Sequence, residues 1–129
     1  MYRLLFVIAV ATSCDPGVSA EFRVNTTGHA RDNVTVRAIA TSQRLASRYG
    51  LLVFRPATDY CQLLSATGSD QVRGQSVMLR LCIGRVDSTQ IRITLGEAIT
   101  MEWGPRGDSL RGELRDSLSH LFGSAFDIR

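Results

Sequence analysis

The sequence predicts a small single-domain α+β fold in which two helices cover one face of a mixed or antiparallel sheet. The chain has 129 residues, which suffices for one domain and is too short for two. Short apolar segments with the length and alternation of strands occupy much of its middle, and apolar residues recur at helical spacing in two segments. Two helices and several strands in a chain of this size imply two layers around one core.

The first element is expected after a polar arm. Residues 15–32 are rich in Pro, Gly, Ser, Thr and Asn, a composition typical of a tether or a loosely held arm. Val34, Val36 and Ala38 then alternate with three other side chains, which predicts a half-buried strand at 34–39. The globular domain is therefore expected to span residues 33–129.

A helix is expected next. Thr41 or Ser42 is a candidate N-cap, Leu45 and Tyr49 fall on one face, and Gly50 is placed to end the helix in a left-handed turn. The apolar residues that follow Gly50 predict a short central strand at 51–54.

The middle of the chain predicts a hairpin. Residues 57–76 are rich in Thr, Ser, Gly and Asp, which predicts a long loop. Segments 77–83 and 90–95 are apolar and read as strands, and the short polar link between them indicates an antiparallel hairpin. A further strand is expected at 99–103.

The C-terminal helix has the most regular pattern. Leu110, Leu114 and Leu118 recur at helical spacing after Asp108, a candidate N-cap, and Gly123 is positioned as a C-cap. A last strand at 125–128 completes the order β-α-β-β-β-α-β. This order resembles ferredoxin-like and related sandwiches, which implies both helices on one face of the sheet.

The N-terminus has the features of an export signal. Arg3 precedes an uncharged apolar run at 4–11, whose length suits a secretory signal and falls short of the roughly 20 residues that span a membrane. Two cleavage sites compete. Val18 and Ala20 are small enough for general signal peptidase, which would leave Glu21 as the first residue.

The alternative site lies directly after the apolar run. Residues 10–14, Val-Ala-Thr-Ser-Cys, resemble the lipobox of bacterial lipoproteins, although Ala11 stands where Leu is commonest. The resemblance implies a signal peptide at 1–13, a diacylglyceryl thioether on Cys14 and acylation of its amino group. Residues 14–32 would then be the lipidated cysteine and its tether. Asp15, by the rule for enteric lipoproteins, would favour retention in the inner membrane.

The other two cysteines are expected to pair. Both cleavage sites leave Cys61 and Cys82 in the exported domain, and an even number in an oxidising compartment favours a disulfide. The bond would close a loop of about 22 residues, worth roughly 3 kcal/mol in the chain-entropy estimate. Two buried free thiols are the alternative.

The charge balance gives no reason to expect a nucleic-acid partner. Every basic residue is arginine, and a chain starting at Cys14 has 14 Arg against 12 Asp and Glu, a net charge of +2. These arginines are scattered singly, without the run or stripe that nucleic-acid binding requires.

One motif carries the letters of an enzyme family. Residues 107–110 spell GDSL and resemble the GDSL hydrolase motif, with Ser109 in the place of the nucleophile. That family also needs a later asparagine block, and no asparagine follows Ser109 here. His120 is eleven residues on, about 16 Å along a helix, which is too far for a base to reach Ser109. Catalysis is therefore not expected.

No other catalytic, metal or cofactor site is expected. His29 and His120 are isolated, and the cysteines lack the paired spacing of a metal site. Trp103 is a candidate interface anchor, with core packing as the alternative.

These observations predict an envelope lipoprotein that is held at the membrane by its lipid anchor and faces the periplasm. Its role would be binding or assembly, without a cofactor, and its partner would be an unidentified envelope protein. The first alternative is a soluble periplasmic or secreted binding or inhibitor protein that begins at Glu21. The second, more remote, is a GDSL-like hydrolase that uses Ser109.

Overall fold

The computed structural model describes residues 17–26, 31–54, 60–123 and 126–128 of the chain. These residues form six strands and two helices. In chain order the elements are β1 (Gly17–Asn25), α2 (Arg31–Arg48), β2 (Leu52–Phe54), β3 (Leu64–Val72), β4 (Gln75–Arg85), β5 (Gln90–Ala98), α3 (Pro105–Phe122) and β6 (Phe126–Ile128).

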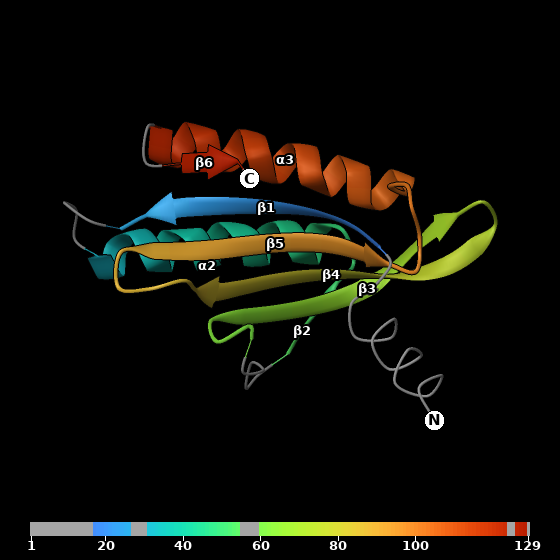
Figure 1. Cartoon of the computed structure of the whole chain (residues 1–129), viewed down its shortest axis with the longest axis horizontal. Helices are drawn as coiled ribbons and strands as arrows, with labels where there is room; N and C mark the ends of the chain where they lie inside the picture. Colours follow the sequence, from blue (N-terminus) through green and yellow to red (C-terminus); the bar gives the residue numbers. More distant parts are fainter. Residues whose placement is uncertain (1–16, 27–30, 55–59, 124–125, 129) are drawn as a thin grey trace, which may run out of the picture.

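All six strands belong to one antiparallel sheet with the order β2-β3-β4-β5-β1-β6. The N-terminal strand β1 lies inside the sheet, between β5 and the short β6 (Figure 1). It pairs with β5 along its whole length, from Gly17 opposite Ala98 to Asn25 opposite Gln90. The predicted α+β fold is confirmed.

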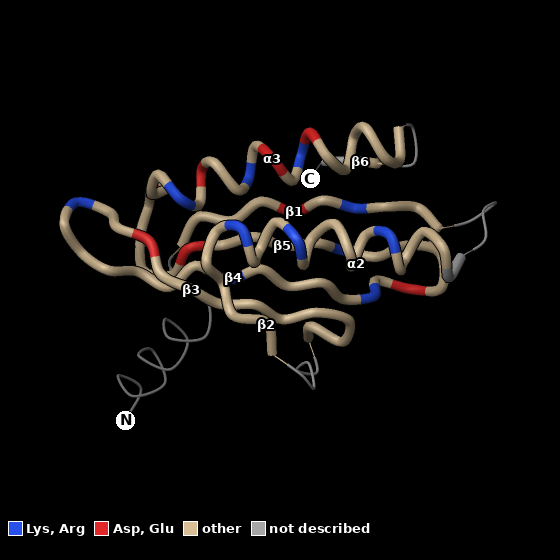
Figure 2. Tube along the Cα trace, turned by 180° about the vertical axis from the view of Figure 1, so that it is seen from behind, with Lys and Arg blue, Asp and Glu red and all other residues tan. Residues whose placement is uncertain are grey.

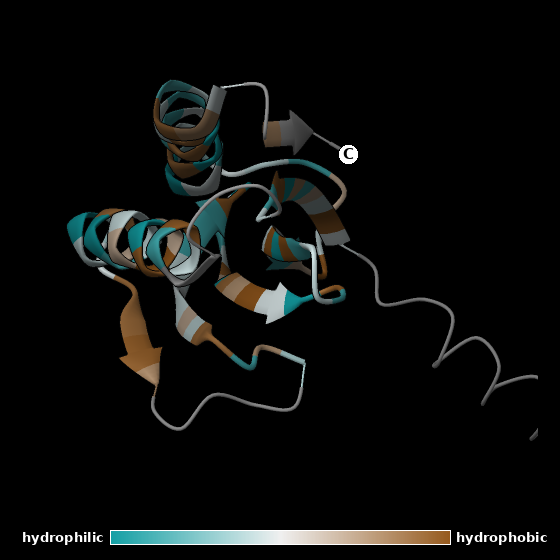
Figure 3. Cartoon of the chain, turned by 90° about the vertical axis from the view of Figure 1, so that its left-hand side faces the viewer, coloured by the Kyte–Doolittle hydropathy of each residue, from teal (hydrophilic) through white to brown (hydrophobic). Residues whose placement is uncertain are grey.

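Both helices lie on the same face of the sheet, as predicted, and no helix of the described residues covers the other face (Figure 3). The core lies between these layers, where α3 places Leu110, Leu114 and Leu118 against the sheet. These three side chains are fully buried, and their spacing keeps them on one side of the helix. Both helices meet this core, α2 through Val34, Ala38 and other buried residues.

Several local predictions are confirmed. The hairpin of β4 and β5 is antiparallel, α3 ends at Phe122, and a final strand follows it. Gly50 has a φ of +78° and Gly123 a φ of +53°, so glycine supplies the left-handed backbone after each helix.

The expectation of a loose N-terminal arm is wrong for residues 17–25, which form β1. Val18, Ala20, Phe22 and Val24 alternate with more polar residues, and Phe22 and Val24 are buried in the core. The Pro, Gly and Ser content outweighed this alternation in the sequence interpretation. The sheet therefore begins well before residue 33.

The strand predicted at 34–39 is also wrong, because these residues are part of α2. Val34 and Ala38 are buried with Leu45, which is helical spacing, whereas Val36 is 61% exposed. A short alternation of β-branched residues resembles a strand until the longer window shows the 3.6-residue period.

Three further predictions in the middle of the chain are wrong. The segment expected as a loop contains β3, whose Ser, Thr and Asp residues occupy strand positions. Strand β2 lies at the edge of the sheet and not at its centre. Residues 99–103 form turns that connect β5 to α3, with no strand among them.

Within the described residues, neither helix is long and apolar enough to cross a membrane.

The packing of α3 gives a stability prediction. Leu114→Ala should lower the free energy of unfolding by about 2–5 kcal/mol, because the cavity forms in a closed core. Urea denaturation measures this loss. Leu52→Ala is the matched control, since Leu52 is 71% exposed, and it should change stability by less than about 0.5 kcal/mol. Equal losses in the two variants would contradict the described core.

Candidate functional site

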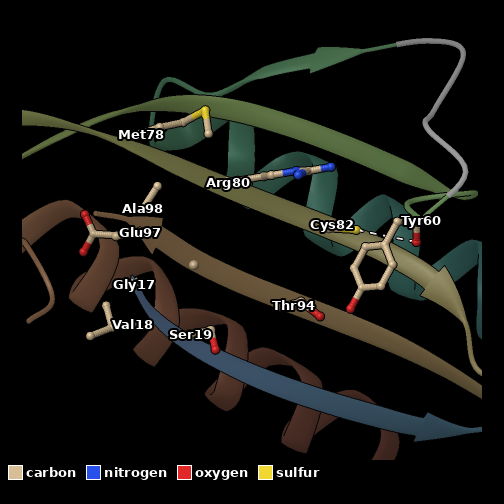
Figure 4. Close-up of a pocket in the computed structure, with 11 residues that line it drawn as sticks. Gly17, Val18, Ser19, Tyr60, Met78, Arg80, Cys82, Thr94, Glu97 and Ala98 are labelled. Carbon is tan, nitrogen blue, oxygen red and sulfur yellow. Dashed lines mark hydrogen bonds between the residues drawn. The ribbon is translucent and has the colours of Figure 1, made fainter. Parts of the chain in front are cut away.

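The face of the sheet away from the helices carries a groove of about 440 Å³ (Figure 4). Strands β1, β5 and β4 supply its floor, and one residue from the loop before β3 closes one end. Its lining residues are Gly17, Val18, Ser19, Tyr60, Met78, Arg80, Cys82, Thr94, Gly96, Glu97 and Ala98.

Small residues make the hollow. Ser19 pairs with Gly96, and Gly17 pairs with Ala98, so two neighbouring positions on two strands have little or no side chain. A side chain at Gly96 would point at the backbone of β1, where an added Cβ would lie 3.3 Å from the carbonyl oxygen of Val18. The low floor leaves the longer side chains of Met78 and Arg80 on β4 as one wall.

The predicted disulfide between Cys61 and Cys82 is confirmed, with the two Cα atoms 5.2 Å apart. It fixes the segment before β3 against β4. Both cysteines are buried, and the Sγ atom of Cys82 lies 3.8 Å from the carbonyl oxygen of Tyr60. The disulfide therefore holds Tyr60 at the end of the groove.

One arginine, Arg80, lines the groove, and a second, Arg92, lies beside the groove residue Tyr60. The guanidinium of Arg92 lies 4.3 Å from the centre of the Tyr60 ring, a cation–π contact. The Nη2 atom of Arg80 donates to the Sγ atom of Cys61 at 3.2 Å. Among the described residues no carboxylate forms an ion pair with either arginine.

Two polar atoms, one in the groove and one beside it, lack hydrogen-bond partners in the described structure. The hydroxyl of Thr94 and the Nε atom of Arg92 are buried without a hydrogen-bond partner in the described structure. Buried polar atoms are normally satisfied, so each of these can bond to a ligand or to water. The groove thus offers cationic donors, an aromatic ring and a hydroxyl to a bound group.

Charge elsewhere is distributed differently. Basic and acidic residues alternate along α3, whereas the described side chains of α2 include Arg37, Arg44 and Arg48 and no acidic residue (Figure 2). Two of these arginines contact α3: Arg48 forms an ion pair with Glu113, and Arg37 lies over the ring of Phe122. Arginines of the helix layer thus have partners within that layer, whereas those at the groove have no carboxylate partner.

Two buried carboxyl groups lie at the N-terminus of α3, on the core side of the sheet. Glu97 of β5 and Asp70 of β3 are 1% and 4% exposed. Glu97 accepts from the N–H of Gly104 at 2.6 Å, and Asp70 accepts from the N–H of Gly107 at 2.7 Å. The two carboxyl groups thus cap the N-terminus of α3, where helix N–H groups have no partner within the helix.

This cap replaces the one predicted from the sequence. Asp108, expected as the N-cap, lies in the first turn of α3, and the N-cap residue is Gly104. A Cβ on Gly104 would collide with the Asp70 carboxylate, and one on Gly107 would lie 2.6 Å from Oε2 of Glu97. The glycines are therefore needed for the close approach of the carboxyl groups.

The pKa values of the two carboxyl groups are shifted in opposite directions. Burial, followed by the interaction with Asp70, raises the pKa of Glu97 to about 7. Burial also acts to raise the pKa of Asp70, but the N–H of Gly107 and the bond to Glu97 lower it below its ordinary value. The Oε1 atom of Glu97 has no hydrogen-bond partner in the described structure. Of the two carboxyl groups, Glu97 is therefore the one that takes up a proton first as the pH falls.

The residues of the hydrolase motif are not assembled into a site. Ser109 and His120 are both exposed on the unbroken helix α3. Tyr49 of α2 hydrogen bonds with Ser109 and Glu113, and the pKa of Tyr49 is raised by burial and by the Glu113 carboxylate. Ser109 thus contributes to the contact between the helices.

The remaining predicted residues are dispersed. Trp103 is half-buried, packs against the core and stacks with Arg111, whose Cζ lies 5.0 Å from the ring. Cys14 and His29 lie outside the described residues. In the described part of the chain no cluster of three or more His, Cys, Asp or Glu side chains fits a metal ion.

The sequence interpretation missed both Asp70 and Glu97. A signal for Glu97 was present: Ile91, Ile93 and Leu95 mark the core face of β5, and Glu97 continues the same alternation. Asp70 had no comparable signal, because its strand reads as a polar loop. The arginines of the groove became visible as neighbours only through the strand register.

Comparison with protein-family models, with curated proteins and with solved structures finds no match for this chain.

The carboxyl pair predicts a pH-dependent stability. The folded-state pKa of Glu97 exceeds its unfolded value, so the stability of this group is fully present below about pH 4.5 and is lost as the pH rises through about 7. The loss should amount to about 3 kcal/mol. Urea denaturation between pH 5 and pH 8 measures it.

Glu97→Gln should remove most of this dependence, because the amide donates to Asp70 without titrating. At pH 8 it should be more stable than the unchanged chain. Glu113→Gln, at an exposed carboxyl paired with Arg48, is the control and should leave the dependence intact. A stability of the unchanged chain that is flat between pH 5 and pH 8 would contradict the raised pKa of Glu97.

The disulfide gives a second prediction. Replacing both cysteines, with Cys61→Ser and Cys82→Ser together, should lower the free energy of unfolding by about 3 kcal/mol. Reductant should lower the stability of the unchanged chain by a similar amount and should not affect the double variant. An unchanged unfolding midpoint in reductant would contradict this role of the bond.

Proposed function

We propose that the protein is a small bacterial envelope lipoprotein, anchored through lipid on Cys14 and facing the periplasm, whose role is to bind a partner. Its binding surface is the groove on the open sheet face. The observation that carries the proposal is the position of β1, which begins at Gly17, three residues after Cys14.

The start of β1 favours one cleavage site over the other. Cleavage after Ala20 would remove the first four residues of β1, 17–20. These residues pair antiparallel with residues 95–98 of β5, from Gly17 opposite Ala98 to Ala20 opposite Leu95. Ala20 also packs against the core. Cleavage before Cys14 keeps the whole strand and one complete side of the groove.

The groove supports a binding role by its chemistry. Arg80 and Arg92 lack a carboxylate partner in the described structure, and Tyr60 is held beside them. Guanidinium groups without a carboxylate partner favour an anionic ligand, and aromatic and arginine side chains are enriched at protein interfaces. We therefore infer that the partner presents an acidic segment to this face.

The anchor is tested by the intact mass of the protein purified from the membranes of a Gram-negative host. The mature chain should begin at Cys14 and carry the mass of a diacylglyceryl group and an acyl group. Cys14→Ser should abolish the lipid mass and release the protein from membranes. Ser13→Ala, which keeps a small residue before the cysteine, is the matched control and should be processed normally.

A mature chain that begins at Glu21 without lipid would overturn the anchor and support the soluble alternative.

A further inference from the structure

Exposed apolar side chains gather at the end of the sheet where β1 begins. Ile99 and Met101, in the link from β5 to α3, are 81% and 84% exposed, and Met78 of β4 is 50% exposed. We call these three residues the apolar end patch. The pairing of Gly17 with Ala98 puts Ile99 next to the first residue of β1, at the end where β1 starts and β5 stops in Figure 1.

The backbone at Ile99 is strained. Its φ is +61°, a left-handed conformation that is a true outlier for a β-branched residue. Glycine or asparagine would fit this turn without the same cost. An isoleucine in a strained turn, with most of its side chain in solvent, gains nothing from the fold that would offset the strain.

The predicted anchor on Cys14 is close in sequence to the start of β1, where this patch lies. Only residues 15 and 16 separate Cys14 from β1, so the two points are no more than about 11 Å apart along the chain. A lipid on Cys14 would therefore bring this end of the sheet to the membrane surface.

We propose that the apolar end patch docks on the lipid bilayer, inserting Ile99 and Met101 into the headgroup region and fixing the orientation of the domain. This inference rests on the proposed lipid anchor. The occupant is the bilayer because the chain enters the sheet at this patch, so the patch faces the membrane in any arrangement that the short link permits.

Tethering explains why so small a patch suffices. The anchor makes docking intramolecular, so its effective concentration is high and a weak contact is populated. The charges around the patch are also compatible with a membrane surface: Arg73 is exposed at the tip of the β3–β4 hairpin and pairs with Glu102 at 2.8 Å. The long arginine side chain can reach phosphate groups from there.

Trp103 is a natural probe of this docking. It is the single tryptophan of the chain and lies two residues after Met101. The mature lipidated protein is reconstituted into phosphatidylethanolamine and phosphatidylglycerol vesicles that contain brominated phosphatidylcholine. Docking should reduce the Trp103 emission, and bromines near the headgroups should reduce it more than bromines deep in the acyl chains.

Two variants separate docking from folding. Ile99→Asn removes an apolar side chain while relieving the strained backbone, and Met101→Glu puts a charge into the patch. Both should restore most of the lost emission, with the proteins still anchored. Leu52→Glu, at an equally exposed apolar residue on the far edge of the sheet, should leave the quenching unchanged.

The outcomes distinguish the two proposals. A mature protein without lipid mass would overturn the anchor itself. Full lipid mass with unquenched Trp103 emission, or quenching that Ile99→Asn and Met101→Glu leave unchanged, would overturn docking alone. A dimer in detergent that Met101→Glu dissociates would assign the patch to a second copy of the chain and also overturn docking.

Discussion

The cap that Asp70 and Glu97 place on α3 is the constraint on which the arrangement of the layers depends. Strands β3 and β5 are not neighbours, because β4 lies between them. Their two carboxyl groups nevertheless reach the N-terminus of the same helix on the core side of the sheet. The start of α3 is thereby fixed to two strands at once, and Leu110, Leu114 and Leu118 follow along a helix whose position is already set.

This cap also makes the stability of the fold depend on pH. A carboxyl pair in a closed core holds together only while one member keeps its proton, and burial alone favours that state. The protein therefore combines a cap of two carboxyl groups with an apolar core, and the raised pKa of Glu97 eases its burial. An amide at this position would cap the helix equally well, so the acid itself makes the fold sensitive to pH.

The sequence predicted the parts of the fold that depend on short-range sequence patterns. The leucine spacing of α3, the alternation of β4 and β5, and the glycines after each helix are short-range signals, and all of them held. The parts that failed depend on distant partners. β1 and β3 look like polar loops because their Ser, Thr and Asp residues are satisfied by strand pairing and by α3, which a local pattern does not contain. The Cys61–Cys82 disulfide was predictable because it follows from the number of cysteines. The groove was not predictable, because its residues are brought together only by the register of three strands.

The position of β1 also sets the order in which the chain can fold. β1 comes first in the sequence, but its partners are β5 and β6, and β6 ends at Ile128, near the last residue. A chain delivered from its N-terminus cannot complete this sheet until Ile128 has arrived. Its longest pairings close late, which keeps folding slow and dependent on distant contacts. On the proposal that the chain is exported, this delay would be useful, because a translocation channel accepts an unfolded polypeptide.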